Sequence, residues 1–488
     1  MREINQKSNN NQECSKEKIL SRENVKIFFL VFCGILGIIL LFYALSFVFR
    51  FRLGSNSVIW PIWGFFTFPN LMGIITCGII LFCFLLAIKY IYKEDSNPKL
   101  YIITILGLIL IVGTNLIHGW QMGIAGAITQ DITRGAEIYN DAIKIKNVFE
   151  FISNYETIQP SLGVHSRTHP PGAVIFIYFL YLLFKDPGLI AIALCSISTI
   201  LSSYFLNGIF KRYFDEKLSK FMTLLFLLLP AVQIYYLANI YAIVISLILG
   251  VIFFYFHPNK KKGIIGASIC LFLATFISFM SFFIVLCLFI FEMIKFRTAF
   301  KAGENNLGTN KFIQLYKNLN KLIIIIGSVV SIYSLFLVLF GFNYLNAFLY
   351  ASESENSQGF ALIANPIKYI VTRVANILDI LIFFGPILIV LCYRGFKILK
   401  EESKINKDIS SIYKLFVSAI IALITIFLIG AYDHGETARA AIYIYPFLLL
   451  PVAIYLKKEK FPQIELKKLI ILIFLQTLLM QLFGFYIW

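Results

Sequence analysis

Long apolar stretches alternate with short charged segments along almost the whole chain. Several stretches, such as 27–49 and 469–488, reach the length of about 20 residues that a helix needs to cross a bilayer. They lack the alternation of apolar and polar positions typical of membrane β-barrels. The pattern predicts an all-α polytopic membrane protein with about 13 transmembrane helices. The predicted spans are 27–49, 71–92, 100–118, 188–208, 220–236, 238–256, 263–280, 281–296, 321–341, 377–395, 413–431, 438–456 and 469–488.

One apolar run is too short for this series, and the charges around it decide the topology. Residues 173–184 lie between two Pro-Gly pairs and cover only about 18 Å as a helix. Counting this run as a crossing would put the lysines of 211–220 and 260–262 outside, against the preference of Lys and Arg for cytoplasmic loops. We therefore expect 173–184 to lie in the membrane interface. The N-terminus is then cytoplasmic, and the long loop 119–187 faces outward.

The net charge of +17 follows from this topology. Lys and Arg gather between the apolar stretches, so their excess indicates membrane orientation and not nucleic-acid binding. A mean hydropathy of +0.81 also places the chain in a bilayer. Residues 1–26 are polar and lack the apolar core of a signal peptide, which predicts a cytoplasmic tail. The cysteines show no CxxC or metal-ligand spacing, and we assign them to packing.

The long outer loop begins with the acidic segment DITRGAEIYND. Asp131 can cap a helix, and helical spacing then places Arg134, Glu137 and Asp141 on one face. A carboxylate at a membrane surface can act as a general base, or bind a divalent ion such as Mg²⁺ or Mn²⁺ that neutralises a phosphate leaving group. A solvated helix face with an ion pair is the plainer interpretation, and no spacing here is diagnostic of a metal.

The same loop ends in the motif HSRTHPPG. Its two prolines fix φ, so Arg167 and His169 would be held at a defined depth near the lipid headgroups, with His165 beside them. Arginine binds phosphate through two parallel hydrogen bonds, which makes this segment a candidate phosphate site. The alternative is a helix start led by proline, with cations that touch headgroups.

A short outer loop with the sequence YDHGETAR ends where a crossing begins. Glu436 and Arg439 either pair with each other or bind a lipid phosphate, because ionisable groups at this depth need a partner or a ligand. Two other polar features are left open. Asp379 lies in a predicted crossing that Pro386 would kink, and the tyrosine-rich segment 233–241 suits a sugar but more often forms an aromatic belt.

These features, in this order, resemble the GT-C superfamily of polyprenyl-phosphate-sugar-dependent glycosyltransferases, which includes protein O-mannosyltransferases and lipid A aminoarabinose transferases. The adjacent acidic pair typical of the O-mannosyltransferases is absent here. The matching residues are similar in particular to those of uncharacterised bacterial and archaeal members. They are Arg134, Glu137, Tyr139 and Asp141, then His169-Pro170-Pro171-Gly172, then Gly435, Glu436 and Arg439.

The resemblance implies transfer of one sugar from a polyprenyl-phosphate-linked donor to a glycan, lipid or protein acceptor at the outer face of the plasma membrane. It implies that Asp141 or Glu137, with Asp131 in reserve, takes the proton of the acceptor. It also implies a set of side chains that bind the donor and stabilise the leaving phosphate. These are Arg167, His169, His165, Arg439, Arg134 and Glu436.

The organisation expected from this resemblance has four parts. A tail (1–26) precedes two extra transmembrane helices (27–99), a GT-C-like core (100–456) and a last loop and helix (457–488). In the outer loop 342–376, the Ser- and Glu-rich stretch 352–357 predicts a mobile segment able to close over the site. A lipid-linked glycan transporter, an O-antigen polymerase or ligase, and a non-catalytic scaffold remain alternatives.

Overall fold

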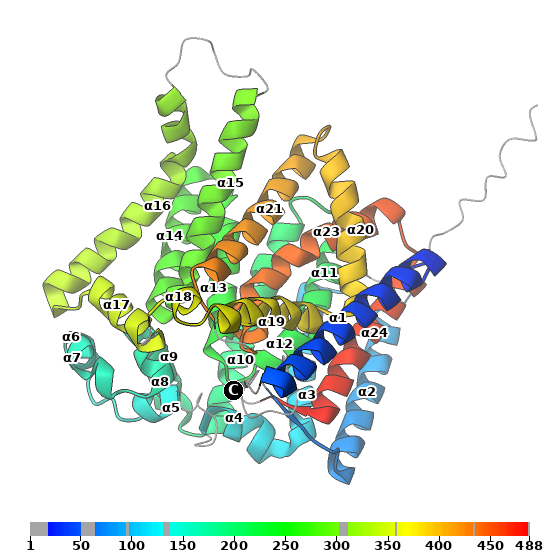
Figure 1. Cartoon of the computed structure of the whole chain (residues 1–488), viewed down its shortest axis with the longest axis horizontal. Coiled ribbons are helices and arrows are strands. Elements are labelled where there is room, and N and C mark those ends of the chain that lie inside the picture. Colours follow the sequence, from blue (N-terminus) through cyan, green and yellow to red (C-terminus); the bar gives the residue numbers. More distant parts are fainter. Residues whose placement is uncertain are drawn as a thin grey trace, which may run out of the picture.

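The computed structural model shows an almost entirely helical protein (Figure 1). It describes residues 18–49, 64–93, 97–129, 137–301, 311–356, 359–432 and 435–486. The helices are α1 (Arg22–Phe49), α2 (Leu71–Ile91), α3 (Leu100–Asn115), η1 (Leu116–His118), η2 (Gln121–Ala125), α4 (Gly126–Thr129), α5 (Glu137–Ala142), α6 (Val148–Ser153), α7 (Tyr155–Ile158), η4 (Gln159–Ser161), α8 (Val164–Arg167), α9 (Pro171–Phe184), α10 (Pro187–Phe210), α11 (Glu216–Leu227), α12 (Pro230–Tyr235), α13 (Ile240–Tyr255), α14 (Lys260–Ile277), η5 (Phe279–Ser281), α15 (Phe282–Lys301), α16 (Lys311–Phe340), α17 (Tyr344–Glu355), α18 (Ala361–Ala364), α19 (Pro366–Phe384), α20 (Pro386–Glu402), α21 (Lys407–Leu428), α22 (Thr437–Ala440), η6 (Ile442–Ile444), α23 (Tyr445–Glu459) and α24 (Gln463–Phe483). Two short strands, β1 (Phe65–Phe66) and β2 (Gly484–Phe485), pair antiparallel.

The prediction of an all-α chain rich in membrane-spanning helices is confirmed. In the part that the structure describes, eight helices are long and apolar enough to cross a membrane, and the bent pair α19–α20 adds a ninth if it is one span. The predicted count of about 13 includes regions that the structure shortens or interrupts. The predicted span 220–236 is divided into α11 and α12, and the span 438–456 into α22, η6 and α23.

The break between α11 and α12 is stabilised by side chains that replace the lost helical hydrogen bonds. Pro230 begins α12 and supplies no N–H to the preceding turn. Gln233 donates from Nε2 to the carbonyl of Leu227 at 2.6 Å, and Thr477 of α24 donates to the carbonyl of Leu228 at 3.2 Å. Asn115 of α3 donates to the carbonyl of Gln233 at 2.8 Å. These bonds fix the direction in which the chain leaves α12 toward α13.

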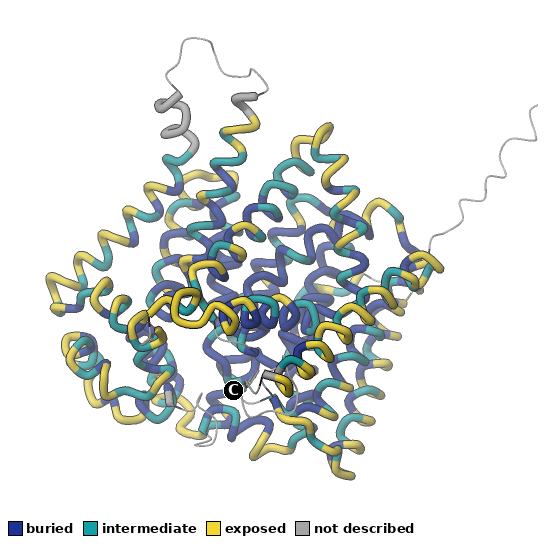
Figure 2. The backbone as a smooth tube through the Cα atoms, viewed as in Figure 1, coloured by how far each residue is buried: buried dark blue, intermediate teal, exposed yellow. Residues whose placement is uncertain are grey.

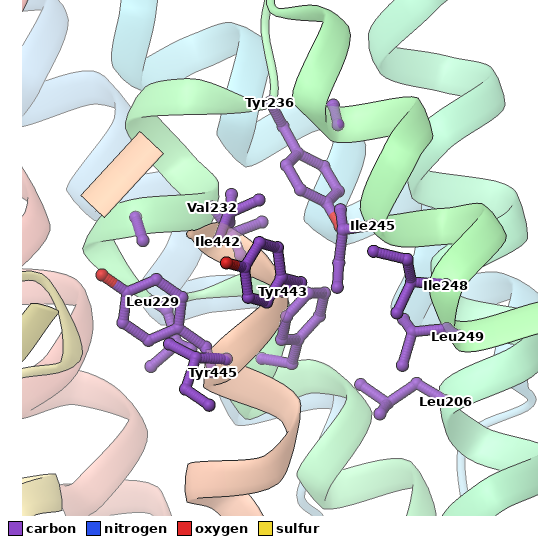
Figure 3. Packing of buried hydrophobic residues seen from close by; sticks show 14 of the residues in the cluster. Leu206, Leu229, Val232, Tyr236, Ile245, Ile248, Leu249, Ile442, Tyr443 and Tyr445 are labelled. Carbon is purple, nitrogen blue, oxygen red and sulfur yellow. The ribbon is translucent and has the colours of Figure 1, made fainter. Parts of the chain in front are cut away.

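The core lies where α10, α13, α21 and α23 meet, and exposed residues gather on the outer helices (Figure 2). Ile245 and Leu249 of α13 pack toward Tyr443 of η6 (Figure 3). Hydroxyl groups join α10 to α13, because Ser202 Oγ lies 2.8 Å from Ser246 Oγ and 2.9 Å from the Tyr236 hydroxyl. Paired hydroxyls of this kind avoid the cost of an unsatisfied polar group in an apolar core.

Helices α19 and α20 meet at an angle of 98°, so the predicted span 377–395, which was expected to kink at Pro386, is divided there. The sequence explains the break, because Gly385 adopts a φ of 99° that only glycine takes without strain, and Pro386 begins the next helix. The kink expected at Pro386 is therefore present but much larger than a simple bend. Helix α19 runs across the bundle instead of along it (Figure 1).

The two ends of the bundle carry different segments (Figure 1). The turn between α20 and α21 lies at one end, and helices α5 to α8 lie at the other with α17. The stretch 352–357, which is expected to be mobile, is helical as far as Glu355, where α17 ends. Helix α17 is also attached to α7, because Glu156 accepts hydrogen bonds from Asn343 N at 2.6 Å and from Asn346 Nδ2 at 3.0 Å. Residues 357–358 lie outside the described residues.

Helix α9 has the bounds that the two Pro-Gly pairs predict. It spans 14 residues, about 21 Å at 1.5 Å per residue, which is short for a crossing. Its first five residues, Pro171–Ile175, are all buried, and so are Ile177 and Leu180 further along. A Cβ on Gly172 would lie 2.2 Å from the carbonyl oxygen of Phe276, so glycine is needed where α9 packs on α14. Its place in the membrane interface stays a prediction.

Candidate functional site

The first predicted site residue, Asp141, holds the outer loop together. One carboxylate oxygen lies 3.3 Å from Lys144 Nζ, and the other accepts the backbone N–H of Gly163 at 2.9 Å. The side chain is nearly buried. Asp141 therefore connects the end of α5 to the start of α8, the helix that precedes the His-Pro-Pro segment.

Replacing Asp141 by alanine is expected to lower the free energy of unfolding by about 1–3 kcal/mol, because the partly buried N–H of Gly163 loses its acceptor. Thermal unfolding in detergent measures this change. Lys144→Ala is the matched control, since Lys144 is 72% exposed and its ion pair contributes about 1 kcal/mol or less. Equal losses in the two variants would show that the ion pair, and not the Gly163 contact, carries the effect.

The His-Pro-Pro segment is held largely through its backbone carbonyls. The Tyr155 hydroxyl lies within hydrogen-bond distance of the carbonyls of Ser166 and His169. Gln159 donates from Nε2 to the carbonyl of Arg167 at 2.8 Å and to that of Ala347 on α17 at 3.0 Å. This anchoring places His169 at the point where α8 ends and α9 begins.

The tautomer of His169 follows from its contacts. Its Nδ1 lies 2.8 Å from the carbonyl oxygen of His165, and because a carbonyl only accepts, Nδ1 carries the proton. The other ring nitrogen, Nε2, is buried and has no hydrogen-bond partner among the described residues. Burial lowers the pKa of His169 to about 4; the charge of Arg439 acts in the same direction, and the bond to His165 opposes it. His169 is therefore neutral at pH 7, with a lone pair on Nε2.

This protonation state limits how His169 could act in a phosphate site. A neutral imidazole cannot attract a phosphate by charge, but its Nε2 can accept a hydrogen bond or a proton. A phosphate beside it would favour the charged form and raise its pKa again. His169 would then become a cation only when an anion is bound.

Acid is expected to destabilise the protein through this histidine. An unfolded histidine titrates near 6.5 and His169 in the folded protein near 4, so between these values the unfolded chain binds the extra proton. The free energy of unfolding therefore decreases as pH falls through this window, by about 3 kcal/mol in total. Unfolding temperatures of wild type and His169→Gln at pH 7 and pH 5 measure the difference. The same pH dependence in both proteins would contradict the assignment.

Arg439 lies beside His169, brought there by the short helix α22. The Arg439 side chain is almost buried, and its guanidinium lies 6.0 Å from the centre of the Tyr241 ring. The His169 ring lies 5.6 Å from the same tyrosine. Nη2 of Arg439 is 3.8 Å from Glu436, a long ion pair. The ion pair between Glu436 and Arg439, one of the two interpretations offered by the sequence, is thus present in the structure.

We call His169, Tyr241, Asp379, Glu436 and Arg439 the outer cluster. Asp379 of α19 joins it through a hydrogen bond of 2.7 Å from the backbone N–H of Ala438, the residue before Arg439. The members come from four segments far apart in the sequence. The structure therefore brings together the His-Pro-Pro motif, the YDHGETAR loop and the tyrosine-rich segment.

Sequence reasoning missed part of this cluster. Tyr241 belongs to the segment whose plainer interpretation is an aromatic belt, but its ring lies close to both His169 and Arg439. The sequence assigns no role to Asp379, and its partner is shown by the contact with α22 in the structure. An ionisable residue inside an apolar stretch was the one available signal.

The remaining predicted site residues are placed as follows. Asp131 and Arg134 lie outside the described residues, and Glu137 begins α5 with a side chain that is likewise outside them. His165 and Arg167 lie on α8, next to His169. Among the described residues, no group of three or more His, Cys, Asp or Glu side chains could hold a metal ion.

Comparisons with known proteins give a distant likeness to solved structures. No family model matches the chain, and no curated protein matches it. Among solved structures, the chain is similar to an oligosaccharyltransferase of Archaeoglobus fulgidus tethered with an acceptor peptide, at 12% identity and a TM-score of 0.41. The match covers 74% of this chain and 49% of that one, so the chain spans about half the length of that structure. A likeness this distant does not establish an activity, and the function has to be argued from the residues of the outer cluster.

Proposed function

We propose that the chain is a membrane glycosyltransferase that moves a sugar from a polyprenyl-phosphate-linked donor to an acceptor at the outer face of the membrane. The observation that carries the proposal is the convergence of His169 and Arg439 on the ring of Tyr241. The GT-C resemblance of the motifs predicts such a convergence of the His-Pro-Pro segment and the late arginine.

Arg439 is suited to stabilise the leaving phosphate. In the reaction the bond between the sugar and the phosphate oxygen breaks, the phosphate keeps the electron pair, and negative charge grows on it. A nearly buried guanidinium acts on that charge more strongly than an exposed one, because water screens it less. Arginine also offers two parallel N–H donors to a phosphate. Arg167 and His165 on α8, with Arg134, extend the proposed donor site.

The acceptor loses its proton as its oxygen or nitrogen bonds to the sugar, and a carboxylate of the acidic segment is the proposed base. Both oxygens of Asp141 are already engaged with Lys144 and Gly163. These contacts favour Glu137 as the base, with Asp131 in reserve. The lone pair of His169 Nε2 would accept a hydrogen bond from a hydroxyl of the bound sugar or acceptor.

A lipid-linked glycan transporter is the second candidate, because transporters often use interrupted helices to bind substrates or ions. The interruption between α11 and α12 has this form. Its freed carbonyls, however, already accept hydrogen bonds from Gln233 and Thr477. Carbonyls that are occupied in this way are poor ion ligands, and the enzyme remains the better supported function.

A transfer assay tests the proposal. Membranes containing the protein are incubated with radiolabelled polyprenyl-phosphate sugars, and label entering a glycan, lipid or protein fraction is measured. We expect transfer with at least one such donor, and none with membranes that lack the protein. Release of label across sealed vesicles without a new covalent product would instead support the transporter.

The outward orientation of the site is also part of the proposal. Cysteines placed at Asn140 and Lys261 should react differently with an impermeant thiol reagent in whole cells. Labelling at Asn140 alone agrees with the Lys- and Arg-bearing loops being cytoplasmic. Labelling at Lys261 alone would reverse the topology.

A further inference from the structure

Helix α19 contacts the segments that precede Arg439 at several points along its length. Tyr369 and Arg373, four residues apart, lie on the same face of the helix, and Asp379 lies further along it. Their partners all lie between Phe427 and Ala438, on the C-terminal end of α21, the following loop and α22. Helix α19, which runs across the bundle, thus contacts the chain both before and after residues 433–434, which lie outside the described residues.

The first two contacts hold the end of α21. The Tyr369 hydroxyl donates to the carbonyl of Leu428 at 2.6 Å. Arg373 donates to the carbonyls of Phe427 at 3.0 Å and Tyr432 at 2.7 Å, and it also bonds the carbonyl of Ala431. The last carbonyls of a helix have no partner within the helix, so these donors both satisfy and fix them.

The third contact holds the start of α22. Asp379 is fully buried and accepts the backbone N–H of Ala438 at 2.7 Å, and the N–H of Thr437 also bonds to it. Arg439 is the next residue along the chain. A hydrogen bond between a carboxylate and a backbone N–H is among the stronger kinds, so it determines where this turn lies.

We propose that α19 is a positioning element of the site, in which Asp379 and Arg373 fix the two ends of the 427–440 loop and so place Arg439 beside Tyr241 and His169. The effect of these residues on transfer rests on the proposed function, whereas their effect on the position of Arg439 does not. Asp379 and Arg373 are positioning residues, since they act through the loop backbone.

A double-mutant cycle tests whether the role of Asp379 runs through Arg439. Asp379→Ala removes the acceptor of the loop N–H groups, and misplacing Arg439 by about 1 Å is expected to reduce transfer about 100-fold. Asp379→Asn keeps an acceptor oxygen and should stay within about fivefold of wild type. In an Arg439→Ala background, Asp379→Ala should reduce transfer by no more than about a further twofold. Fully multiplicative losses would overturn the proposal.

A second measurement follows Arg439 without any substrate. Modification of Arg439 by phenylglyoxal in the detergent-solubilised protein, read by mass spectrometry, should be slow in wild type because the side chain is only 5% exposed. It should become at least about fivefold faster in Asp379→Ala, which frees the loop locally. Lys368→Gln is the matched control, an exposed residue on the same helix, and should leave the rate unchanged.

Arg373→Gln gives the same test from the other end of the loop if Asp379→Ala does not fold. Faster modification of Arg439 in that variant supports the positioning role. Slow modification in every folded α19 variant would overturn it, even if transfer is lost. Faster modification in a protein that shows no transfer with any donor would support the positioning role and count against the proposed function alone.

Discussion

Arg439→Ala is expected to lower transfer about 100- to 1000-fold, the largest effect of any single replacement in the outer cluster. Its guanidinium lies near both the Tyr241 ring and Glu436, in surroundings that exclude most water. Loss of a preorganised group facing a developing charge raises the barrier more than it weakens ground-state binding. The drop should therefore appear mainly in kcat, with a smaller increase in the KM of the donor.

Arg439→Lys separates charge from geometry. Lysine keeps the positive charge but offers no planar pair of donors, so its activity should lie between wild type and Arg439→Ala. Folding is checked by the unfolding temperature in detergent. If Arg439→Ala transfers sugar at the wild-type rate, the assignment of the phosphate site is wrong.

Glu137→Gln is expected to have the second largest effect, a fall in kcat of about 100-fold or more, because a glutamine cannot take the proton of the acceptor. The KM of the donor should change little, since the base does not touch the phosphate. Asp141→Asn is the matched comparison. Asp141 is bound to Lys144 and Gly163, so that variant should lose stability more than turnover.

The outcome for the acidic segment can go against this expectation in two ways. Full turnover in Glu137→Gln with loss in Asp131→Asn would move the base to the start of the segment. Full turnover in all three variants would remove the acidic segment from the chemistry, and His169 would become the candidate base through its Nε2 lone pair.

Local signals in the sequence predicted much of the fold. The short helix α9 has the expected bounds because prolines and glycines at both ends act on the chain nearest to them. Between α19 and α20 the local signal predicts a kink but not its size, which is 98° in the structure. A Gly-Pro pair indicates that a helix is interrupted, but the angle is set by what packs on both sides.

The sequence indicates most residues of the candidate site but not which of them lie next to one another. Sequence spacing suggested Asp141 as a base, yet its partner Gly163 lies 22 residues away and no periodicity indicates that contact. For Arg439 the sequence is compatible with an ion pair to Glu436 or with a phosphate site. The distance of 3.8 Å to Glu436 is compatible with both roles. The link from Asp379 to Ala438 joins residues 59 positions apart. Such contacts depend on tertiary packing.

Photocrosslinking of a donor mimic tests the central claim most directly, namely that the His-Pro-Pro segment and the YDHGETAR loop form one site for a lipid phosphate. A polyprenyl phosphate with a photoreactive group next to the phosphate is irradiated with the protein in membranes, and the labelled peptides are identified by mass spectrometry. We expect label both within 165–172 and within 436–441, competed by unlabelled polyprenyl phosphate and reduced in Arg439→Ala. Label confined to other parts of the chain, unchanged by that replacement, would contradict the account.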